Sequence, residues 1–455
     1  MKIHRTMLFQ RTRLFIVLTQ FCFVAGRHSI VNGTLSRKLQ EEISSYQSIA
    51  DQIIKLSVNG AAQNQSYNRL ATFVDKFGSR LAGTQNLENA IDYMLDVLAR
   101  DGLENVHGES VKVPHWVRGS ESAVMLEPRI KPLSILGLGY SNGTPTKGIK
   151  AEVLVVESFD ELHKRASEAK GKIVVYNQKY VSYGVSVEYR SSGATEAAKV
   201  GGVASLIRSI TPFSINSPHT GMQSYGNGVK KIPTACITVE DAEMMKRMAD
   251  RGEKIVILLK MEAKNLPDVE SRNTVAEIVG HQCPEQTLNR VVLVSGHLDS
   301  WDVGQGAMDD GGGAFISWQK TNALSLIKQL GLRPRRTLRL EQGGVGSSQY
   351  YGRHKKDIDN FDLVMESDEG TFTPYGIYFS GSKSATSIMT SVTKLLKSIN
   401  ATVLKPKADG EDIDLWMQHG DTMTVQDPHQ MNLCAAVWAV VAYTVADLEE
   451  MLPRK

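Results

Sequence analysis

Apolar residues recur at helical spacing along the N-terminal part of the chain, between residues 45 and 104. The first run contains Ile49, Ile53, Ile54 and Leu56, and the second contains Leu87, Ile91, Met94, Leu95 and Leu98. Residues three or four positions apart lie on the same face of a helix, so each run predicts a helix with one buried face. Between the runs, the turn-rich segment G-S-R-L-A-G-T (78–84) predicts a connection.

The pattern changes between residues 120 and 268, where short apolar segments alternate with many glycines and prolines. The predicted strands are 151–156, 172–176, 204–207 and 254–259, with a predicted helix at 160–170. Short strands bounded by turn residues are typical of a β-rich sheet with few helices. This region is therefore predicted to form a separate β-rich α/β module.

After residue 270, predicted strands and helices alternate. The strands are 273–280, 290–296, 337–340 and 361–368, a helix opens at 311–318, and an almost wholly apolar helix closes the chain at 431–446. This alternation predicts an α/β fold with a mainly parallel central sheet and helices on both faces. The closing helix has fewer than the ~20 apolar residues that span a bilayer, so it is predicted to be a core helix.

The N-terminus predicts entry into the secretory pathway. A basic start leads into a short apolar run at 14–26 that ends in small residues, which is typical of a signal peptide (1–26) cleaved near Gly26. The alternative is an anchor helix, but the apolar run is shorter than the ~20 residues that an anchor needs. Residues 27–44 are a possible pro-segment. In this context, four Asn-x-Ser/Thr motifs predict N-glycosylation at Asn32, Asn64, Asn142 and Asn400.

Length, charge and cysteine content narrow the class of protein. A chain of 455 residues predicts two domains or one large domain with an insertion. A net charge of +3, from 52 basic and 49 acidic residues, favours neither nucleic acid nor an anionic membrane as a partner. Cys22 lies in the signal segment, and Cys236, Cys283 and Cys434 have no paired spacing. Neither a disulfide scaffold nor a thiolate metal site is predicted.

Histidine and carboxylate residues gather where strands of the C-terminal half end. They are His297, Asp299, Asp309, Asp310, Glu341, Glu366, Asp368 and, in a later loop, His419. Ligands of open α/β sheets bind beyond the carboxyl ends of the strands. Histidine with several carboxylates and no thiolate suits zinc or a similar divalent ion.

Each of these residues also has an ordinary structural interpretation. Asp309 or Asp310 alone is more often a helix N-cap, and Asp299 or Asp421 alone would be a turn residue. A single loop histidine is usually a surface residue, and this interpretation is given to His107, His163, His281 and His354. Only the combination at several strand ends indicates a metal site.

The segment G-H-L-D-S-W-D-V-G-Q-G-A-M-D-D-G-G-G (296–313) resembles the first motif of the two-zinc exopeptidases of the aminopeptidase Y class. The resemblance continues through K-I-P-T-A-C-I-T-V-E-D-A-E-M-M (231–245) and E-E-M-L-P (449–453), so it covers nearly the whole mature chain. It implies a zinc peptidase domain (45–119 and 269–455) interrupted by a protease-associated module (120–268). It also implies a zymogen, homodimers, and hydrolysis of dipeptides or small peptides in a secreted or lysosomal setting, after transit through the endoplasmic reticulum and Golgi.

The resemblance also implies a role for each candidate residue. His297, Asp309 and Asp368 match the ligands of one zinc ion, and Asp309, Glu341 and His419 match those of a second, with Asp309 bridging the two. Asp299, to which a catalytic role is assigned, would orient the imidazole of His297. A hydroxide shared by the two ions would attack the peptide carbonyl, while zinc polarises its oxygen.

The chain departs from this family pattern before Glu341. Relatives have two adjacent glutamates there, a general base followed by a metal ligand, whereas this chain has Leu340-Glu341-Gln342. Glu341 matches the ligand, so the base is missing. Several strand residues before it are missing too, which shortens the strand by roughly 20 Å. We therefore expect either that Glu341 does not reach the metals or that the sheet shifts its register.

Two further interruptions lie before His419, where a pocket segment is missing, and at Q-K-T-N (319–322), an apparent insertion. Loss of a general base typically costs ~10²–10⁴-fold in rate. The hypothesis is a zinc carboxypeptidase or dipeptidase whose present chain is impaired. The alternative is a non-catalytic binding or receptor-like protein that keeps the peptidase fold. Motifs of serine hydrolases, one-zinc proteases and phosphate loops do not occur in the sequence.

Overall fold

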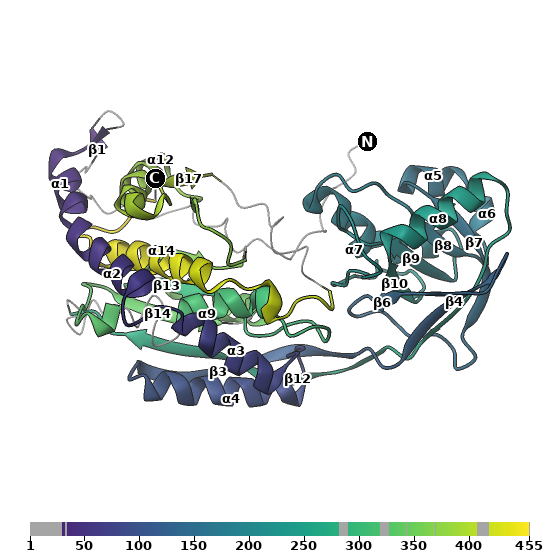
Figure 1. Cartoon of the computed structure of the whole chain (residues 1–455), viewed down its shortest axis with the longest axis horizontal. Coiled ribbons are helices and arrows are strands. Elements are labelled where there is room, and N and C mark those ends of the chain that lie inside the picture. The colour runs from purple at the N-terminus through teal and green to yellow at the C-terminus, as the bar shows by residue number, and fades with distance from the viewer. Residues whose placement is uncertain are drawn as a thin grey trace.

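The central sheet of the C-terminal half has five strands in the order β15-β13-β14-β12-β3. The computed structural model describes residues 30–31, 34–281, 290–318, 327–342, 344–368, 370–406 and 418–454. The strands are β3 (Glu104–Val117), β12 (Lys264–Ile278), β13 (Val291–Ser295), β14 (Thr337–Gln342) and β15 (Phe361–Glu366). Strands β13 and β14 lie in the left-hand part of the molecule in Figure 1, and β3 and β12 extend from there towards the right-hand part.

Only the centre of this sheet is parallel. Strand β13 runs parallel to both neighbours, β14 and β15, whereas β12 is antiparallel to β14 and to β3. The chain leaves the sheet through β3 and returns through β12, so these two long strands must run in opposite directions. The α/β class is therefore confirmed, but the sheet is mixed and its parallel part is limited to three strands.

Both faces of the sheet are covered, as the apolar run of β13 requires. Val292 and Val294 pack into the main core, while Val291 and Leu293 pack against Tyr350 on the opposite face. The main core is formed with α2 (Gln47–Asn59), α3 (Gln65–Phe77), α4 (Gln85–Arg100), α9 (Gly313–Trp318) and α14 (Pro428–Asp447). Tyr350 belongs to α11 (Gly344–His354). The predicted helices at 45–104 and at the C-terminus are thus confirmed as core helices.

A second sheet has eight strands in the order β5-β4-β11-β7-β8-β9-β10-β6. They are β4 (Glu121–Glu127), β5 (Lys131–Leu133), β6 (Ile135–Gly137), β7 (Ile149–Val156), β8 (Ile173–Tyr176), β9 (Ala204–Arg208), β10 (Thr234–Ile237) and β11 (Val256–Met261). All of them fall inside the segment 120–268, which the sequence predicts to be a module. Helices α5 (Phe159–Lys164), α7 (Tyr183–Lys199) and α8 (Val239–Asp250) pack beside it.

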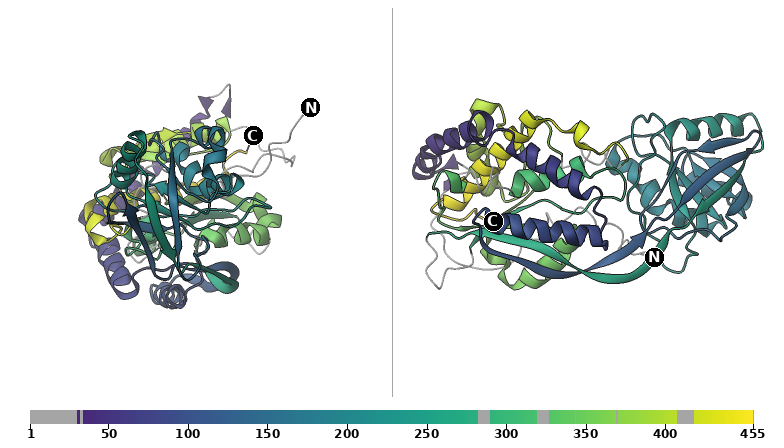
Figure 2. Two further views of the ribbon diagram at one scale, coloured as in Figure 1. Left: turned by 90° about the vertical axis from the view of Figure 1, so that its right-hand side faces the viewer. Right: turned by 60° about the horizontal axis from the view of Figure 1, so that its bottom comes forward.

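The two sheets are joined by the long strands β3 and β12, which run from one part of the molecule into the other (Figure 2). Near this junction Arg118 donates to both carboxylate oxygens of Asp302, at 2.8 and 2.6 Å. Trp301 lies against Gly139, where a Cβ atom would come within 2.4 Å of its ring. The segment 120–268 therefore contacts, through Gly139, the loop that follows β13.

The structure bears on several other sequence predictions. Among the described residues, no helix is long and apolar enough to cross a membrane. Cys236 and Cys434 are buried free thiols. The signal segment 1–26, Asn32, Cys283 and the segment 319–322 lie outside the described residues. The expected pro-segment (27–44) overlaps helix α1 (Arg37–Ser45). Leu39 and Ile43 of this helix are buried.

The core between α3 and α9 offers a test of this packing. Phe73 is fully buried, and its ring centroid lies 5.0 Å from that of Phe315 and 5.1 Å from that of Phe77. We expect Phe73→Ala to lower the free energy of unfolding by about 3–5 kcal/mol, because it leaves a cavity. Chemical denaturation followed by tryptophan fluorescence measures this loss. Phe213→Ala is the control, since Phe213 is 71% exposed and its loss should cost within about 0.5 kcal/mol.

Candidate metal centre

Three side chains that the sequence singled out converge at one edge of the central sheet. His297 Nε2 lies 3.1 Å from Asp309 Oδ1 and 3.5 Å from Asp368 Oδ1. One ligand atom from each of the three residues lies within 4.8 Å of the others. Among the residues that the structure describes, this is the group with the geometry to hold a metal ion.

The register of the parallel strands brings His297 and Asp368 together. Ser295 at the end of β13 pairs with Glu366 at the end of β15. His297 and Asp368 each follow two residues later, so they leave the sheet at the same level. Asp309 comes from the turn η1 (Ala307–Gly312), which leads into α9. These three side chains therefore converge at the carboxyl ends of the strands, as the sequence leads us to expect.

The imidazole of His297 is oriented by the residue two positions later. Its Nδ1 atom lies 2.8 Å from the backbone oxygen of Asp299 and 3.5 Å from a carboxylate oxygen of the same residue. A carbonyl oxygen only accepts, so Nδ1 carries the proton and Nε2 faces Asp309 and Asp368. This orientation leaves the Nε2 lone pair available to a metal.

Two buried carboxylates hold the backbone around Asp309. Asp310 accepts from the backbone N–H of His297 at 3.0 Å and from that of Gly313 at 3.1 Å. Asp421 accepts from the N–H groups of Met308 at 2.6 Å and Asp309 at 3.1 Å. The peptide bond between Asp309 and Asp310 is cis. These contacts fix the segment that carries the ligand Asp309.

The concentration of negative charge shows in the pKa values. Burial raises the pKa of Asp310 well above its ordinary value, and burial with nearby Asp368 raises that of Glu366 to about 7. Burial also raises the pKa of Asp421 to about 7, against the two backbone donors. Burial opposes protonation of His297, but hydrogen bonds with Asp299, Asp309 and Asp368 outweigh it and raise its pKa.

These carboxylates favour a positive charge in their midst, and a divalent ion supplies one. The donors are one imidazole nitrogen and carboxylate oxygens, which is a set that zinc accepts. The residues present therefore fit a zinc ion.

The backbone of Glu341 lies at the same edge of the central sheet as the ends of β13 and β15. Strand β14 pairs with β13 without interruption, and Glu341 is level with Ser295. It is therefore two residues short of the level at which His297 and Asp368 leave the sheet. The side chain of Glu341 lies outside the part of the chain that the structure describes.

Leu340, which stands where the family resemblance places a general base, points into the main core and is fully buried. No carboxylate there could reach a substrate without leaving the core.

His419, the other expected ligand of a second metal, is exposed and does not belong to the group of three. The preceding residue, Gln418, accepts a hydrogen bond from Ser217 of the inserted segment at 2.8 Å. Asp421, two residues later, is buried and binds the backbone beside Asp309. The described structure thus places the loop 418–421 beside the metal centre through Asp421.

Two residues of this centre were missed at the level of sequence. The sequence alone makes Asp421 a turn residue and places Arg80 only in a turn-rich connection. Arg80 is fully buried and donates hydrogen bonds to the backbone on both sides of the loop between His297 and Asp309. The H-G-D spacing to His419 is a signal that could have found Asp421. For Arg80, the sequence offers no signal except an arginine in an otherwise glycine-rich turn.

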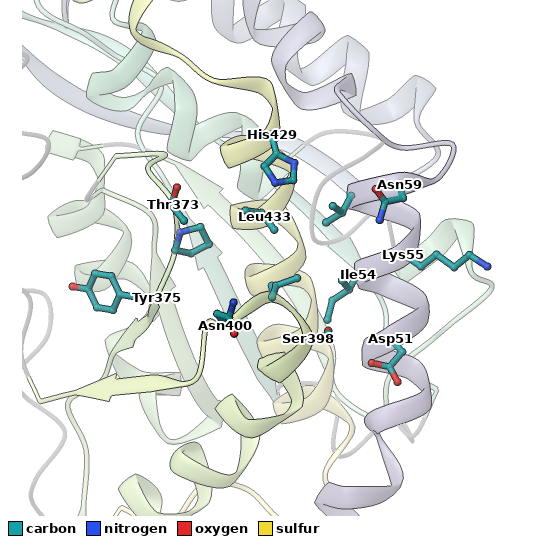
Figure 3. A pocket seen from close by; sticks show the side chains of 13 residues that line it. Asp51, Ile54, Lys55, Asn59, Thr373, Tyr375, Ser398, Asn400, His429 and Leu433 are labelled. Atoms are coloured by element: carbon teal, nitrogen blue, oxygen red, sulfur yellow. The ribbon is translucent and has the colours of Figure 1, made fainter.

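A groove of about 720 Å³ lies elsewhere on the same part of the molecule (Figure 3). Ile54, Val58 and Leu433 line it with apolar side chains, and Asn400 and His429 contribute polar ones. None of its lining residues belongs to the metal centre.

Comparisons with known proteins agree with this architecture. Residues 273–421 match the model of peptidase family M28. Carboxypeptidase Q of Xenopus laevis is 61% identical over 470 positions, which cover 97% of this chain and 99% of that protein. The human carboxypeptidase Q is 60% identical and covers 94% of this chain and 96% of its own length.

Solved structures show the same fold. A peptidase M28 precursor from Shewanella amazonensis superposes with a TM-score of 0.83 at 28% identity, covering 90% of this chain and 99% of that one. A zinc aminopeptidase from Bacillus subtilis superposes with a TM-score of 0.62 at 16% identity, covering 84% and 95% of the two chains.

The fold and the histidine–carboxylate centre define the class of this protein as a metal-dependent exopeptidase, a hydrolase of peptide bonds. Its similarity to the carboxypeptidase Q proteins extends over almost the whole chain, at 60–61% sequence identity. The chain belongs to the family of the proteins named carboxypeptidase Q, and its residues 273–421 match peptidase family M28. The alignment with the frog protein runs over 470 positions although this chain has 455 residues, so the relative contains segments that this chain lacks.

The role of His297 can be tested by metal binding alone. We expect His297→Ala to weaken zinc binding on the order of 100-fold or more, because it removes a ligand and not merely a residue that supports one. Competition with a chromogenic chelator measures the affinity. His163→Ala is the matched control, because His163 lies on the inserted segment and its side chain is 49% exposed. Equal zinc affinities of the two variants would contradict the site.

Proposed function

We propose that this chain is a zinc-dependent carboxypeptidase or dipeptidase whose zinc is held by His297, Asp309 and Asp368. The observation that carries the proposal is the convergence of these three side chains at the carboxyl edge of the sheet. The names of the relatives support a peptide substrate and cleavage at a chain end. When bound, zinc polarises a carbonyl oxygen and lowers the pKa of a bound water.

The protein's own residues would orient this chemistry. The backbone oxygen and carboxylate of Asp299 hold His297 with Nε2 toward the cluster. Asp310 and Asp421 hold the backbone of the segment that presents Asp309. Fixed ligands lower the cost of reorganisation when a substrate binds, which is how a preorganised site contributes to rate.

A second zinc, held by Asp309, Glu341 and His419, completes the proposed two-zinc centre. The exposure of His419 and the position of the Glu341 backbone suggest that this second ion is held more weakly than the first. Metal analysis of the purified protein after dialysis distinguishes the two sites by their stoichiometry.

The missing general base sets the expected level of activity. We expect zinc-loaded protein to hydrolyse dipeptides about 10²–10⁴-fold more slowly than a relative that has both glutamates. Steady-state kinetics with dipeptides that have free carboxyl ends measures kcat/KM. Hydrolysis at the rate of an intact relative would contradict the impairment.

Restoring a glutamate at position 340 is not expected to restore the rate. Leu340 lies in the core, so Leu340→Glu buries an unpaired carboxylate and lowers stability by several kcal/mol. Leu340→Met is the control, because a swap that conserves volume costs less than about 1.5 kcal/mol. The thermal midpoint and kcat/KM of both variants separate a loss of stability from a gain of base.

A non-catalytic binding protein is the alternative function, and the missing base favours it. The three intact ligands favour the enzyme instead, since a scaffold without chemistry has no need of a buried group of like charges. Zinc bound in the purified chain together with slow but zinc-dependent hydrolysis supports the enzyme. Absence of both supports the binding protein.

Residues 45–119 and 269–455 are proposed to form the peptidase domain and 120–268 a protease-associated module. The location of all eight strands of the second sheet between residues 121 and 261 supports this division. Homodimerisation, a cleaved pro-segment and a secreted or lysosomal location are proposed from the family resemblance and the N-terminal sequence.

The described glycosylation motifs differ in their surroundings. Asn400 is exposed, with a φ of 57°, at the rim of the groove of Figure 3. Asn64 instead exchanges two hydrogen bonds of 2.8 Å with Asn432. Asn142 accepts a bond of 3.0 Å from Asn265. Asn400 therefore has the most open position for a glycan among these three.

We expect Asn400→Gln to remove one glycan from protein made in a eukaryotic secretory host. Electrophoresis before and after treatment with a peptide N-glycosidase measures the change in mass. Asn59→Gln is the matched control, because Asn59 lines the same groove without a glycosylation motif. An unchanged mass for Asn400→Gln would show that this motif is unused.

A further inference from the structure

We propose that Arg80 is a positioning residue for the metal centre, because its guanidinium group fixes the backbone on both sides of the loop that separates His297 from Asp309. The effect on metal binding rests on the proposed zinc site. The claim that Arg80 holds the loop does not depend on zinc. Arg80 lies in the connection between α3 and α4, about 220 residues away from this loop in the sequence.

The hydrogen bonds of Arg80 reach both ends of the loop. Nε donates to the backbone oxygen of Leu298 at 2.7 Å, immediately after His297. Nη1 donates to Gln305 at 2.7 Å and Nη2 to Gly306 at 2.9 Å, immediately before the turn that carries Asp309. A single planar group thus ties together the two chain segments that present the ligands. A lysine ammonium cannot place its donors in this fixed fork.

The backbone of Arg80 is bound to the same loop. Its N–H donates to the Ser300 hydroxyl at 2.9 Å, and its carbonyl oxygen accepts from the Ser300 N–H at 3.1 Å. Gly306, with a φ of 58°, lies so near that a Cβ atom there would be 2.2 Å from Ser300 Cβ and 3.0 Å from Arg80 Nη2. The loop therefore closes tightly around the arginine.

The charge of Arg80 also suits its position. Its side chain is fully buried, with the guanidinium 5.0 Å from the ring centroid of Phe73. Burial lowers its pKa to about 10, while the carboxylates of Asp421, Asp299, Asp309 and Asp310 raise it. Arg80 is therefore a cation at neutral pH, and it offsets part of the negative charge of the ligand cluster before any metal binds.

Arg336 offers a matched control. It is also a buried arginine, and it donates to the backbone oxygens of Val445 and Glu449. It lies just before β14, at the end of the sheet opposite to the ligands. Arg336→Lys should therefore cost stability as Arg80→Lys does, without acting on the loop 298–306.

The test compares Arg80→Lys with Arg336→Lys in two measurements. Hydrogen exchange of the metal-free proteins is expected to be faster at residues 298–306 in Arg80→Lys only. Competition with a chelator is expected to show zinc affinity about 10–100-fold weaker in Arg80→Lys and unchanged in Arg336→Lys. Ser300→Ala, which removes the hydroxyl that accepts from the backbone N–H of Arg80 and donates to the backbone oxygen of Trp301, is the mild variant if Arg80→Lys does not fold. It should show the same two effects to a smaller degree.

Two results would overturn the proposal. Unchanged exchange at 298–306 would show that Arg80 does not hold the loop. Faster exchange with unchanged zinc affinity would show that the loop does not position the ligands, so that Arg80 is only structural. If the unaltered chain binds no zinc, the proposed function fails, and the exchange measurement still decides whether Arg80 holds the loop.

Discussion

The centre of this protein depends on confining several carboxylates in a buried place. Asp309 and Asp368 face one imidazole at the edge of the sheet, with the carboxylates of Asp310, Glu366 and Asp421 close to this pair, and burial raises the pKa of several of these groups. Like charges in a low dielectric repel strongly unless cations or donors offset them. Backbone N–H groups satisfy Asp310 and Asp421, Arg80 adds a fixed positive charge, and a divalent ion held by the proposed ligands would supply the rest.

Much of this arrangement could be predicted from the sequence. The apolar run of β13 requires cover on both faces, and the ends of parallel strands meet at one edge, so His297 and Asp368 had to lie close together. The predicted helices were found at nearly the expected positions, and so were four of the eight strands of the inserted segment, β7, β8, β9 and β11, because their apolar periodicity reflects burial directly. Strands β4, β5, β6 and β10 were not predicted. What local patterns could not give was the antiparallel half of the sheet, which follows from the chain leaving through β3 and returning through β12.

Arg80 and Asp421 escaped prediction for a physical reason. Each acts through backbone groups that are distant in sequence, and backbone N–H and C=O groups have no identity that a pattern could reveal. Asp299 was predicted to orient His297 through its carboxylate, and the shorter contact is made by its backbone oxygen instead. Interactions of this kind depend on the path of the loop, which tertiary structure alone determines.

The strand segment that the family resemblance implies is missing would act unequally on the two halves of the proposed centre. The proposed ligands of the first zinc follow β13 and β15 or lie in the turn η1, and none of them lies on β14. Strand β14 keeps its pairing with β13, because Leu338 and Leu340 bury their side chains in the core, and so the sheet that presents His297 and Asp368 is intact. The family's general base and the proposed second zinc would instead depend on the end of β14 and on the loop at His419. Loss of residues before Glu341 would therefore remove catalytic groups and leave the fold and the proposed first zinc site in place, since different strands provide them.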